Sequence, residues 1–476
     1  MTIDRELTAA LALHRFGFGP VRDQIAALAE DPRGAVLADL ERPQAGRVAA
    51  ANLPSSGEAA RALFDYRAEQ TAKTKLAARA RKEAKMPGAG HDLPDAAADL
   101  AGAMPPAKAS PQLPAQLIQN EAKARFDAAI DSEIGFVERL VWFWSNHFCI
   151  SADKIFSMAG PYEREAIRPH VLGRFADLLQ AVESHPAMLF YLDNEQSMGA
   201  DSIAGINRDK GINENLAREI LELHTLGARS GYTQADVISL ANVLTGWTFI
   251  GPGVPGHGGE FAFVKRFHEP GERTVLGKRY PDTGAQQARA VLADLARNPA
   301  TARHIAQKLA RHFVADESPQ ALVGKLEKTF LDTDGDLKQV ARALIEADES
   351  WTLQRSKLKP PAQWIAGVLR LTGAQWAIPI GRVMAAQAAL GEALWRPPAP
   401  SGYPDVEAAW IDGVPHRLDI ASEFAGRLAD GLEPLALLDS SLGPLVSPQT
   451  RDTIARAESR TQALALLVMT PEYLRS

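Results

Sequence analysis

Residues 213–227 read Asn213-Glu214-Asn215-Leu216-Ala217-Arg218-Glu219-Ile220-Leu221-Glu222-Leu223-His224-Thr225-Leu226-Gly227. The apolar residues in this stretch recur at helical spacing and predict a short helix with one buried stripe. Glu214, Arg218 and Glu222 form an i, i+4, i+8 stripe beside the apolar one. A ladder of opposite charges along the edge of a buried face indicates either an ion-pair brace or the wall of a polar site.

Helical spacing of apolar residues extends along most of the chain, which is rich in Ala, Leu, Glu and Arg. Alternating runs of β-branched residues are scarce. We therefore predict a mainly α protein, a large multi-helix globular domain with one small β-hairpin and a partly disordered insertion. The regions expected are an N-terminal helical segment at 1–66 that packs on the main body, a charged helix and a mobile Pro/Gly/Ala-rich insertion at 67–114, and the main helical domain at 115–476.

Local signals place several elements within the main domain. A long helix is predicted from about Gln116 to His147, with aromatic residues and His147 on its inner face. Gly227 is predicted to end the acidic helix, and Thr233 with Asp236 resembles a capping box that begins the next one. Alternating residues on both sides of a Glu-Pro-Gly turn predict a β-hairpin at 261–280. Further amphipathic helices are predicted at 298–314 and 336–347.

Composition narrows the classes of protein to consider. The 476 residues carry a formal net charge of −6 and a pI near 6.0, so no overall basic surface suggests nucleic-acid binding. No apolar run is long enough to predict a membrane segment, and the N-terminus lacks the pattern of an export signal, so we expect a cytoplasmic protein. The single cysteine, Cys149, excludes an internal disulfide and a multi-cysteine zinc site and is expected to be a buried thiol.

The segment Trp142-Phe143-Trp144-Ser145-Asn146-His147-Phe148 ends the aromatic helix with a histidine that faces inward. His147 is a candidate general base or metal ligand. The alternative is a core histidine that is hydrogen-bonded to a backbone carbonyl, with tryptophans packed around it.

The carboxylates of the acidic helix are the second candidate set. Glu219 and Glu222 are suited to acid–base chemistry or to a divalent cation, because neighbouring carboxylates share a proton or recruit a positive partner. Arg218 is already such a partner, so an ion-pair brace without a ligand is equally consistent with the pattern. The Glu-x-x-His and His-Glu-x-x-His spacings of known metal sites are absent from the sequence.

Two further sets carry basic or imidazole groups. Lys308 lies four residues after His304 and four before His312, so these residues share one face of a predicted helix. This basic stripe is interpreted as an anion-binding surface, as a partner for the acidic helix, or as a solvated helix face. His268 lies at the turn of the predicted hairpin, a rigid position that favours chemistry, although most exposed turn histidines are inert.

Several longer motifs occur together in this chain: Leu13-His14-Arg15-Phe16-Gly17-Phe18-Gly19-Pro20, Trp142 to Phe148 and Asn213 to Gly227 as quoted above, Gly231-Tyr232-Thr233, Leu244-Thr245-Gly246-Trp247 and Phe267-His268-Glu269. In their order and spacing the chain resembles the bacterial "domain of unknown function 1800" proteins over nearly its whole length. The resemblance implies a shared polar set but assigns no role to its members: His147, Asn215, Arg218, Glu219, Glu222, Trp247 and His268. Because the position of His224 accepts other residues in that family, His224 is a poor candidate ligand.

The resemblance also implies a partner. Many members of the family are exported, and they are often encoded beside "domain of unknown function 1501" proteins, which resemble the sulfatase and alkaline phosphatase superfamily. A periplasmic location by co-export with a signal-bearing partner is therefore the alternative to a cytoplasmic one.

Two hypotheses for function follow. The first is a hydrolase-like enzyme, either dependent on a divalent metal or using general acid–base catalysis, whose catalytic candidates are His147, Glu219, Glu222, Arg218 and His268. Its metal ligands would be His147, Glu219, Glu222 and His268, and its substrate contacts Trp144, Asn146, Asn215, Trp247, Lys308 and His312. The second is a non-catalytic accessory or assembly partner of the neighbouring phosphatase-like protein. We favour the enzyme, which requires the histidines and the acidic helix to meet at one cavity.

Overall fold

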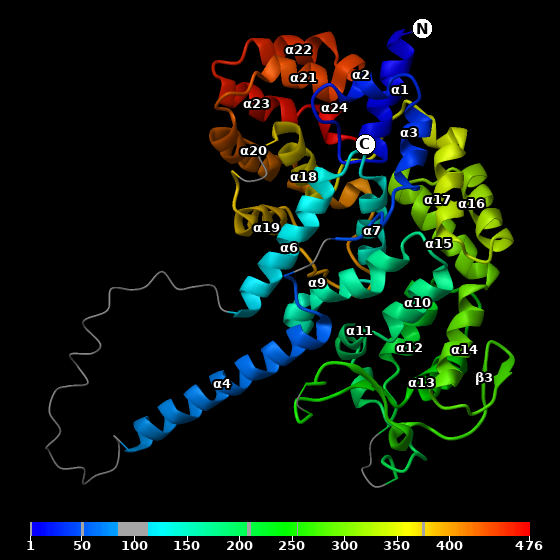
Figure 1. Cartoon of the computed structure of the whole chain (residues 1–476). Helices are drawn as coiled ribbons and strands as arrows, with labels where there is room; N and C mark the ends of the chain where they lie inside the picture. Colours follow the sequence, from blue (N-terminus) through cyan, green and yellow to red (C-terminus); the bar gives the residue numbers. More distant parts are fainter. Residues whose placement is uncertain (1, 49–51, 84–112, 207–210, 255, 374–376) are drawn as a thin grey trace, which may run out of the picture.

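A computed structural model describes residues 2–48, 52–83, 113–206, 211–254, 256–373 and 377–476. Helices dominate these residues, and their strands form two sheets of two strands each (Figure 1). The predicted mainly α class is confirmed. Among the described helices, none has both the length and the apolar character that crossing a bilayer requires.

The α-helices form three groups along the chain. The first comprises α1 (Thr2–Arg15), α2 (Gln24–Leu28), α3 (Pro32–Asp39), α4 (Ser56–Glu83), α6 (Leu113–Asp131) and α7 (Phe136–His147). The second comprises α8 (Ala152–Ile155), α9 (Ala159–Tyr162), α10 (Phe175–Glu183), α11 (Pro186–Tyr191), α12 (Asn215–Glu219), α13 (Gln234–Leu244), α14 (Ala285–Ala296), α15 (Pro299–Phe313), α16 (Gln320–Asp332) and α17 (Leu337–Glu346). The third, at the upper left of Figure 1, comprises α18 (Pro361–Thr372), α19 (Ile380–Ala389), α20 (Val414–Leu428), α21 (Pro434–Leu442), α22 (Pro448–Ala455), α23 (Arg460–Val468) and α24 (Pro471–Leu474).

Short helical turns connect these elements. The π-helical turns are η2 (Glu163–Ile167) and η5 (Ile220–His224). The 3-10 turns are η1 (Phe156–Met158), η3 (Arg168–His170), η4 (Asn194–Gln196), η6 (Lys265–Phe267), η7 (Asp348–Trp351), η8 (Glu407–Ala409), η9 (Ile411–Gly413) and η10 (Gly443–Leu445).

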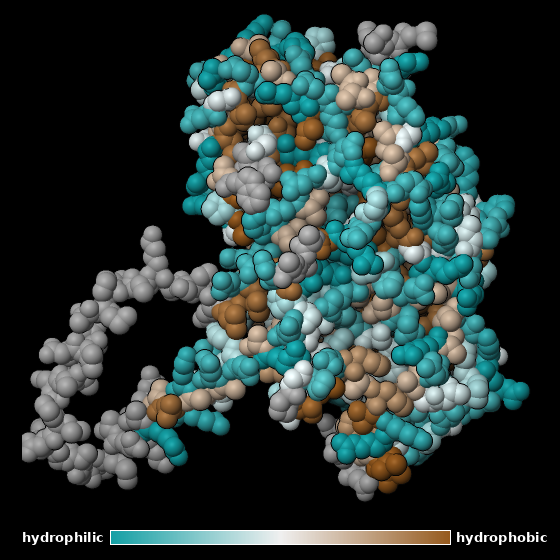
Figure 2. Space-filling view, viewed as in Figure 1, coloured by the Kyte–Doolittle hydropathy of each residue, from teal (hydrophilic) through white to brown (hydrophobic). Residues whose placement is uncertain are grey.

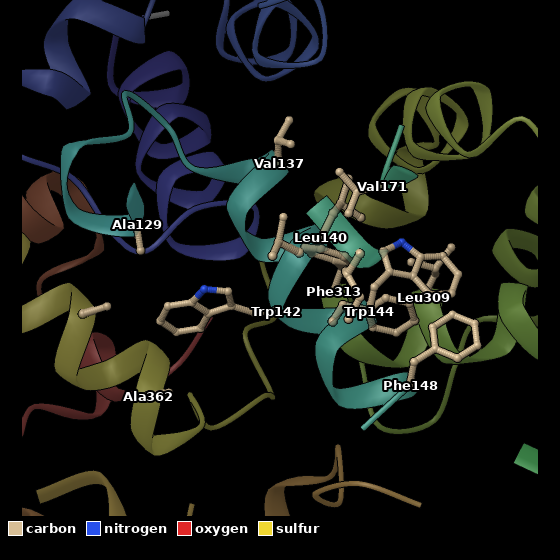
Figure 3. Close-up of a cluster of buried hydrophobic side chains, with 14 of the residues drawn as sticks. Ala129, Val137, Leu140, Trp142, Trp144, Phe148, Val171, Leu309, Phe313 and Ala362 are labelled. Atoms are coloured by element: carbon tan, nitrogen blue, oxygen red, sulfur yellow. The ribbon is translucent and has the colours of Figure 1, made fainter. Parts of the chain in front are cut away.

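Helix α7 forms the centre of the molecule, and most of its side chains are buried. In Figure 3, Trp142 points to one side of α7, toward Ala362 of α18, whereas Trp144 lies on the other side with Leu309 and Phe313 of α15. The helix therefore joins the C-terminal group of helices to the middle group. Burial of two tryptophans on opposite faces makes a large apolar contribution to both contacts.

The long helix predicted from Gln116 to His147 is wrong in one respect, because the structure divides it into α6 and α7. Gly135 lies between them with φ +92°, a left-handed conformation that favours glycine. A Cβ at Gly135 would come within 2.8 Å of the Phe18 ring, so the break is also held by close packing. α7 therefore begins as a separate helix after Gly135.

The single hairpin predicted at 261–280 is also wrong, although its strand segments exist. Strand β2 (Phe261–Phe263) pairs with β1 (Trp247–Phe249), and β3 (Arg273–Val275) pairs with β4 (Lys278–Tyr280). The turn of the second hairpin is Leu276-Gly277, and both residues have positive φ. This is the twist that a two-residue hairpin turn requires, so it selects the β3–β4 pairing.

Other local predictions are confirmed. Thr233 and Asp236 form the predicted capping box of α13, α15 and α17 occupy the predicted ranges, and Asp336 caps α17. Helix α4 runs through the predicted boundary at residue 66, and its described side chains from 67 to 79 are exposed. Figure 1 shows this part of α4 extending away from the body, and Figure 2 shows that it is mostly hydrophilic. The Pro/Gly/Ala-rich insertion was predicted at 86–114. Its residues 86–112 lie outside the described residues.

Candidate functional site

The acidic helix does not keep the predicted ladder of charges. The α-helical part, α12, is followed by the π-helical turn η5, which has more residues per turn, so Glu222 leaves the stripe. Arg218 donates a hydrogen bond to Glu214 at 2.7 Å, whereas Glu222 accepts one from the Tyr232 hydroxyl at 3.1 Å. The first half of the ladder is thus a partly exposed ion pair, which corresponds to the brace alternative.

Glu219 and Asn215 occupy the flank of this helix. Burial raises the pKa of Glu219, and the neighbouring His224 opposes the change. The backbone N–H of Asn215 donates to the side chain of Asn213 at 2.9 Å, which places Asn215 in a local turn at the start of α12.

Two imidazoles satisfy the free carbonyl groups at the end of the acidic helix. Nε2 of His147 lies 3.2 Å from the His224 carbonyl oxygen, and Nε2 of His304 lies 3.1 Å from the Leu223 carbonyl oxygen. Burial, reinforced by Lys308, lowers the pKa of both histidines, so each is neutral and donates from Nε2. His147 therefore has the geometry of the core histidine that the sequence left open as an alternative, and its Nδ1 carries a lone pair.

His224 forms a buried pair with an acidic residue. Its Nδ1 lies 2.7 Å from Oε1 of Glu183, and both side chains are almost fully excluded from solvent. This pair ties η5 to α10 beside His147. It is a feature of the core that the spacing of the acidic helix alone did not indicate.

His268 and Trp247 lie in a different part of the structure. Nδ1 of His268 lies 2.9 Å from the Thr245 carbonyl oxygen, and its ring packs on Phe263. Trp247 is fully buried in strand β1, where it packs edge-on against Phe261. Their contacts hold β1 and β2 together.

The predicted metal ligands are not brought together. Within the ranges that the structure describes, no group of three or more His, Cys, Asp or Glu side chains is arranged to hold a metal ion. His147, Glu219, Glu222 and His268 instead make the separate contacts given above.

A cavity of about 80 Å³ lies between the end of α7 and the proline-rich loop at 394–405. Its walls include the predicted site residues Asn146 and His312. The polar and aromatic residues that line it are Arg125, Arg139, Trp142, Ser145, Asn146, Cys149, His312, Gln363, Gln387, Glu392, Trp395, Tyr403, Asp405 and Trp410. Few of these residues were candidates from the sequence.

Asn146 fixes the loop against α7. Its Nδ2 donates to the Tyr403 carbonyl at 2.9 Å, and its Oδ1 accepts from the Tyr403 N–H at 2.7 Å. Cys149 adds a contact to the same loop, because its thiol donates to the Pro400 carbonyl at 3.1 Å. Burial raises the pKa of Cys149 to about 12, so it is the buried, unreactive thiol that was predicted.

His312 and Asp405 form a buried acid–imidazole pair in the cavity wall. Nδ1 of His312 lies 2.7 Å from Oδ2 of Asp405, and Nζ of Lys357 lies 3.3 Å from Oδ1. Burial alone would raise the pKa of Asp405, but its two partners lower it below the usual range. Burial lowers the pKa of His312, so the ring is neutral, and its Nε2 lies 3.2 Å from the guanidinium of Arg139. The neutral ring therefore donates from Nδ1 and accepts at Nε2.

Glu392 is a carboxyl group in the cavity wall whose pKa is raised strongly. Burial raises its pKa to about 7, even though the N–H of Ala362, at the start of α18, donates to Oε2 at 2.7 Å. Oε1 of Glu392 accepts no hydrogen bond from any residue that the structure describes. A carboxyl group in this state exchanges protons near neutral pH.

Three other polar groups in the cavity wall have no hydrogen-bond partner in the part of the chain that the structure describes. The indole N–H groups of Trp142 and Trp410 and Oε1 of Gln387 are buried without a hydrogen bond to any described residue. An unpaired buried polar atom costs about 1–3 kcal/mol, so each one calls for an explanation, and a bound water or ligand in the cavity is one such explanation.

A buried ion network supports the cavity from behind. Glu163, in the π-helical turn η2, pairs with Arg125 at 2.8 Å and with Arg168 at 3.0 Å. It also accepts hydrogen bonds from Ser145 and from the indole of Trp395, both of which line the cavity. This network fixes the wall through four charge-assisted or polar contacts on one carboxylate.

A second hollow, of about 270 Å³, shares Asn146 and the segment Tyr403–Asp405 with the cavity. It is lined in addition by His147, Lys308 and Arg311. Four predicted site residues therefore line these two adjoining spaces: Asn146 lines both, His312 lines the cavity, and His147 and Lys308 line the hollow. Among the residues that the structure places, the other candidates (Trp144, Asn215, Arg218, Glu219, Glu222, Trp247 and His268) line neither hollow.

The residues that sequence reasoning missed lie far from the motifs that drew attention. Glu392 and Asp405 flank a proline-rich loop more than 240 residues after α7. The one signal for them was the loop itself, because a rigid proline-rich segment that carries acidic and aromatic residues is suited to forming a site wall. No sequence pattern predicted that this loop would contact Asn146.

Comparison with known proteins identifies a family but no function. The sequence model described as "Protein of unknown function (DUF1800)" matches residues 11–475. No curated protein and no solved structure matches the chain.

Proposed function

The chain belongs to the DUF1800 family, and we propose that it is a hydrolase-like enzyme that uses general acid–base catalysis in the cavity beside the 394–405 loop. The observation that carries the proposal is Glu392. Its carboxyl group lines the cavity, has a pKa of about 7 and keeps one oxygen free of hydrogen bonds from the described residues. A general base is most effective when its pKa lies near the working pH.

In this proposal Glu392 accepts a proton from a water molecule that attacks the substrate and then returns the proton to the leaving group. Oε1 is the oxygen that exchanges the proton, because Oε2 is held by the Ala362 N–H. Each turnover consumes one water molecule: its oxygen bonds to the substrate as the bond to the leaving group breaks. Glu392 ends in its starting protonation state.

Arg139 and His312 supply the electrostatic part of the proposed site. The Arg139 guanidinium is buried in the cavity wall and is fixed by the Gly17 carbonyl at 3.0 Å and by His312. A fixed cation of this kind stabilises negative charge that develops on a reacting oxygen. Asp405 orients the ring of His312, so it acts on the site through that ring.

The size and walls of the cavity limit the proposed substrate. A space of about 80 Å³ between the tryptophans of the wall suits the reacting end of a small molecule with a flat or apolar part. The unpaired indole N–H groups of Trp142 and Trp410 would donate to its polar atoms.

The proposal is tested by screening the full chain with p-nitrophenyl acetate, phosphate, sulfate and β-glucoside. We expect one class to be hydrolysed, with a rate that rises through pH 7, and the Glu392→Gln variant to lose at least a hundredfold in kcat. Glu30→Gln, which removes an exposed carboxylate, is the matched control. Equal rates for the Glu392→Gln and wild-type proteins would overturn the assignment.

The exposed arm of α4 favours an accessory role as a second candidate. Residues 67–79 of this helix are exposed, and the part of them that the structure describes carries more basic than acidic side chains. A helix that extends into solvent gains little from packing, so contact with another protein would stabilise it. The proposed partner is a neighbouring protein of the "domain of unknown function 1501" kind, and co-purification with and without residues 67–83 tests it.

A further inference from the structure

The second hollow contains a lysine that pairs with none of the residues placed by the structure. Lys308 lines the hollow on α15, and its ammonium group makes no hydrogen bond or ion pair with any part of the chain that the structure describes. Buried or half-buried lysines normally pair with a carboxylate, because desolvation of an unpaired charge is costly. Burial accordingly lowers the pKa of Lys308 to about 8.

The carboxylate that lines the hollow together with Lys308 is already paired. Asp405 lines the same hollow, but one of its oxygens pairs with His312 at 2.7 Å and the other lies 3.3 Å from Lys357. Lys357 also pairs with Asp316 at 2.7 Å. Asp405 therefore raises the pKa of Lys308 without forming an ion pair with it.

Apart from Asp405, the polar side chains that line the hollow with Lys308 are cationic or neutral. Arg311, one turn further along α15, also lines the hollow, and among the described residues its guanidinium is bonded through Nε alone, to the Asp316 carbonyl at 3.3 Å. His147 lines the hollow as a neutral ring whose buried Nδ1 has no partner among the described residues. His304 is neutral, and the thiol of Cys149 is protonated. The hollow thus carries two cationic side chains, Lys308 and Arg311, and the carboxylate that lines it, Asp405, is already paired with His312 and Lys357.

We propose that this hollow binds the oxyanion of a small molecule, a phosphate or carboxylate group, through Lys308 and Arg311. The position of the hollow gives this group a role, because Asn146 and the Tyr403–Asp405 segment form walls of both the hollow and the cavity that holds Glu392. On the proposed function, the oxyanion is the part of the substrate that anchors it beside the catalytic cavity. The anion binding itself does not depend on catalysis.

Isothermal titration calorimetry of the full chain with inorganic phosphate and with acetate tests the proposal. We expect saturable binding of at least one of these anions, and the comparison of the two identifies which oxyanion is preferred. Lys308→Met should weaken the binding about 10- to 100-fold, as expected for loss of a charge-assisted hydrogen bond. Lys328→Met, on the exposed face of α16, makes the same change in net charge and should leave the Kd unchanged.

A second measurement remains informative if Lys308→Met does not fold. In the wild-type protein, trace acetylation with acetic anhydride followed by peptide mass spectrometry reports the reactivity of each lysine. We expect the bound anion to slow acetylation of Lys308 and to leave that of Lys328 unchanged. Absence of saturable binding of both anions, or equal binding by the wild-type and Lys308→Met proteins, would overturn the proposal. Anion binding without turnover of any substrate would instead count against the hydrolase.

Discussion

Gly402 lies so close to Asn146 that a side chain at position 402 would clash with it. A Cβ on Gly402 would lie 2.4 Å from the Asn146 carbonyl oxygen and 2.7 Å from its Oδ1. Gly402 also has φ +78°, a conformation that favours glycine. The contact lets Asn146 pair with the next residue, Tyr403, and so sets the wall shared by the cavity and the hollow.

We therefore predict that Gly402→Ala destabilises the protein by about 2–4 kcal/mol, the sum of a steric clash and backbone strain. Gly391→Ala is the matched control, because Gly391 has a similar φ of +88° but no atom within 4 Å of the added Cβ. Its cost should be about 1 kcal/mol, from strain alone. Urea unfolding curves of the two variants measure both losses in the free energy of unfolding. Equal losses would show that the close contact between Gly402 and Asn146 does not contribute to stability.

Asn146→Asp tests the paired hydrogen bonds without changing the size of the side chain. The carboxylate still accepts from the Tyr403 N–H, but it places a second acceptor against the Tyr403 carbonyl. We expect a loss of about 1–3 kcal/mol in the free energy of unfolding. Hydrogen exchange at the Tyr403 amide should accelerate more in Asn146→Ala, which removes both bonds, than in Asn146→Asp.

Sequence patterns predicted the helices well because local spacing and capping determine them. The capping box of α13 and the range of α15 are set by residues that are close in the chain. The pairing of β2 with β1 was missed, since the strand after Gly246 is only three residues long and its partner lies beyond a loop. The split between α6 and α7 was missed because a single glycine gave too weak a signal.

The candidate site was predictable only in part, and for a physical reason. Asn146, His147, Lys308 and His312 lie on helices whose inner faces can be read from the sequence. Glu392 and Asp405 depend on how a distant loop packs against α7, and the pKa of Glu392 depends on its burial there. Side chains that the sequence suggested as catalytic groups have structural contacts instead. His147, for example, caps the end of the acidic helix, and Arg218 forms an ion pair with Glu214.

Glu392→Gln should also change stability in a way that depends on pH. Burial raises the pKa of Glu392 from an ordinary value of 4.5 to about 7. The folded protein therefore binds this proton more tightly than the unfolded chain, so stability falls as pH rises from about 4.5 to 7. Glutamine cannot ionise, and we expect the variant to be more stable than the wild type at pH 8, by on the order of 1–2 kcal/mol, and similar to it at pH 4.5.

Thermal unfolding at these two pH values measures the effect. Glu30→Gln, at an exposed position, should show no such dependence. A Glu392→Gln variant that is less stable than the wild type at pH 8 would contradict the raised pKa, because a carboxylate that is favourably ionised would then have been lost.

His304 gives the opposite pH dependence. Burial lowers its pKa from 6.5 to about 4, with Lys308 acting in the same direction. The unfolded chain then binds the proton more readily than the folded protein, so stability is retained above about pH 6.5 and falls as pH decreases toward 4. Because His304 caps the Leu223 carbonyl at the end of the acidic helix, this loss reports on that contact.

We expect His304→Gln, which retains a donor and does not titrate, to reduce the fall in free energy of unfolding between pH 7 and 4.5 by on the order of 1–2 kcal/mol. His257→Gln is the matched control, since it makes the same substitution at an exposed histidine. Urea unfolding at several pH values provides the comparison. If His304→Gln and His257→Gln have the same profile, His304 is not held neutral by burial, and the acid sensitivity belongs to other histidines whose pKa burial lowers, among them His14, His147 and His312.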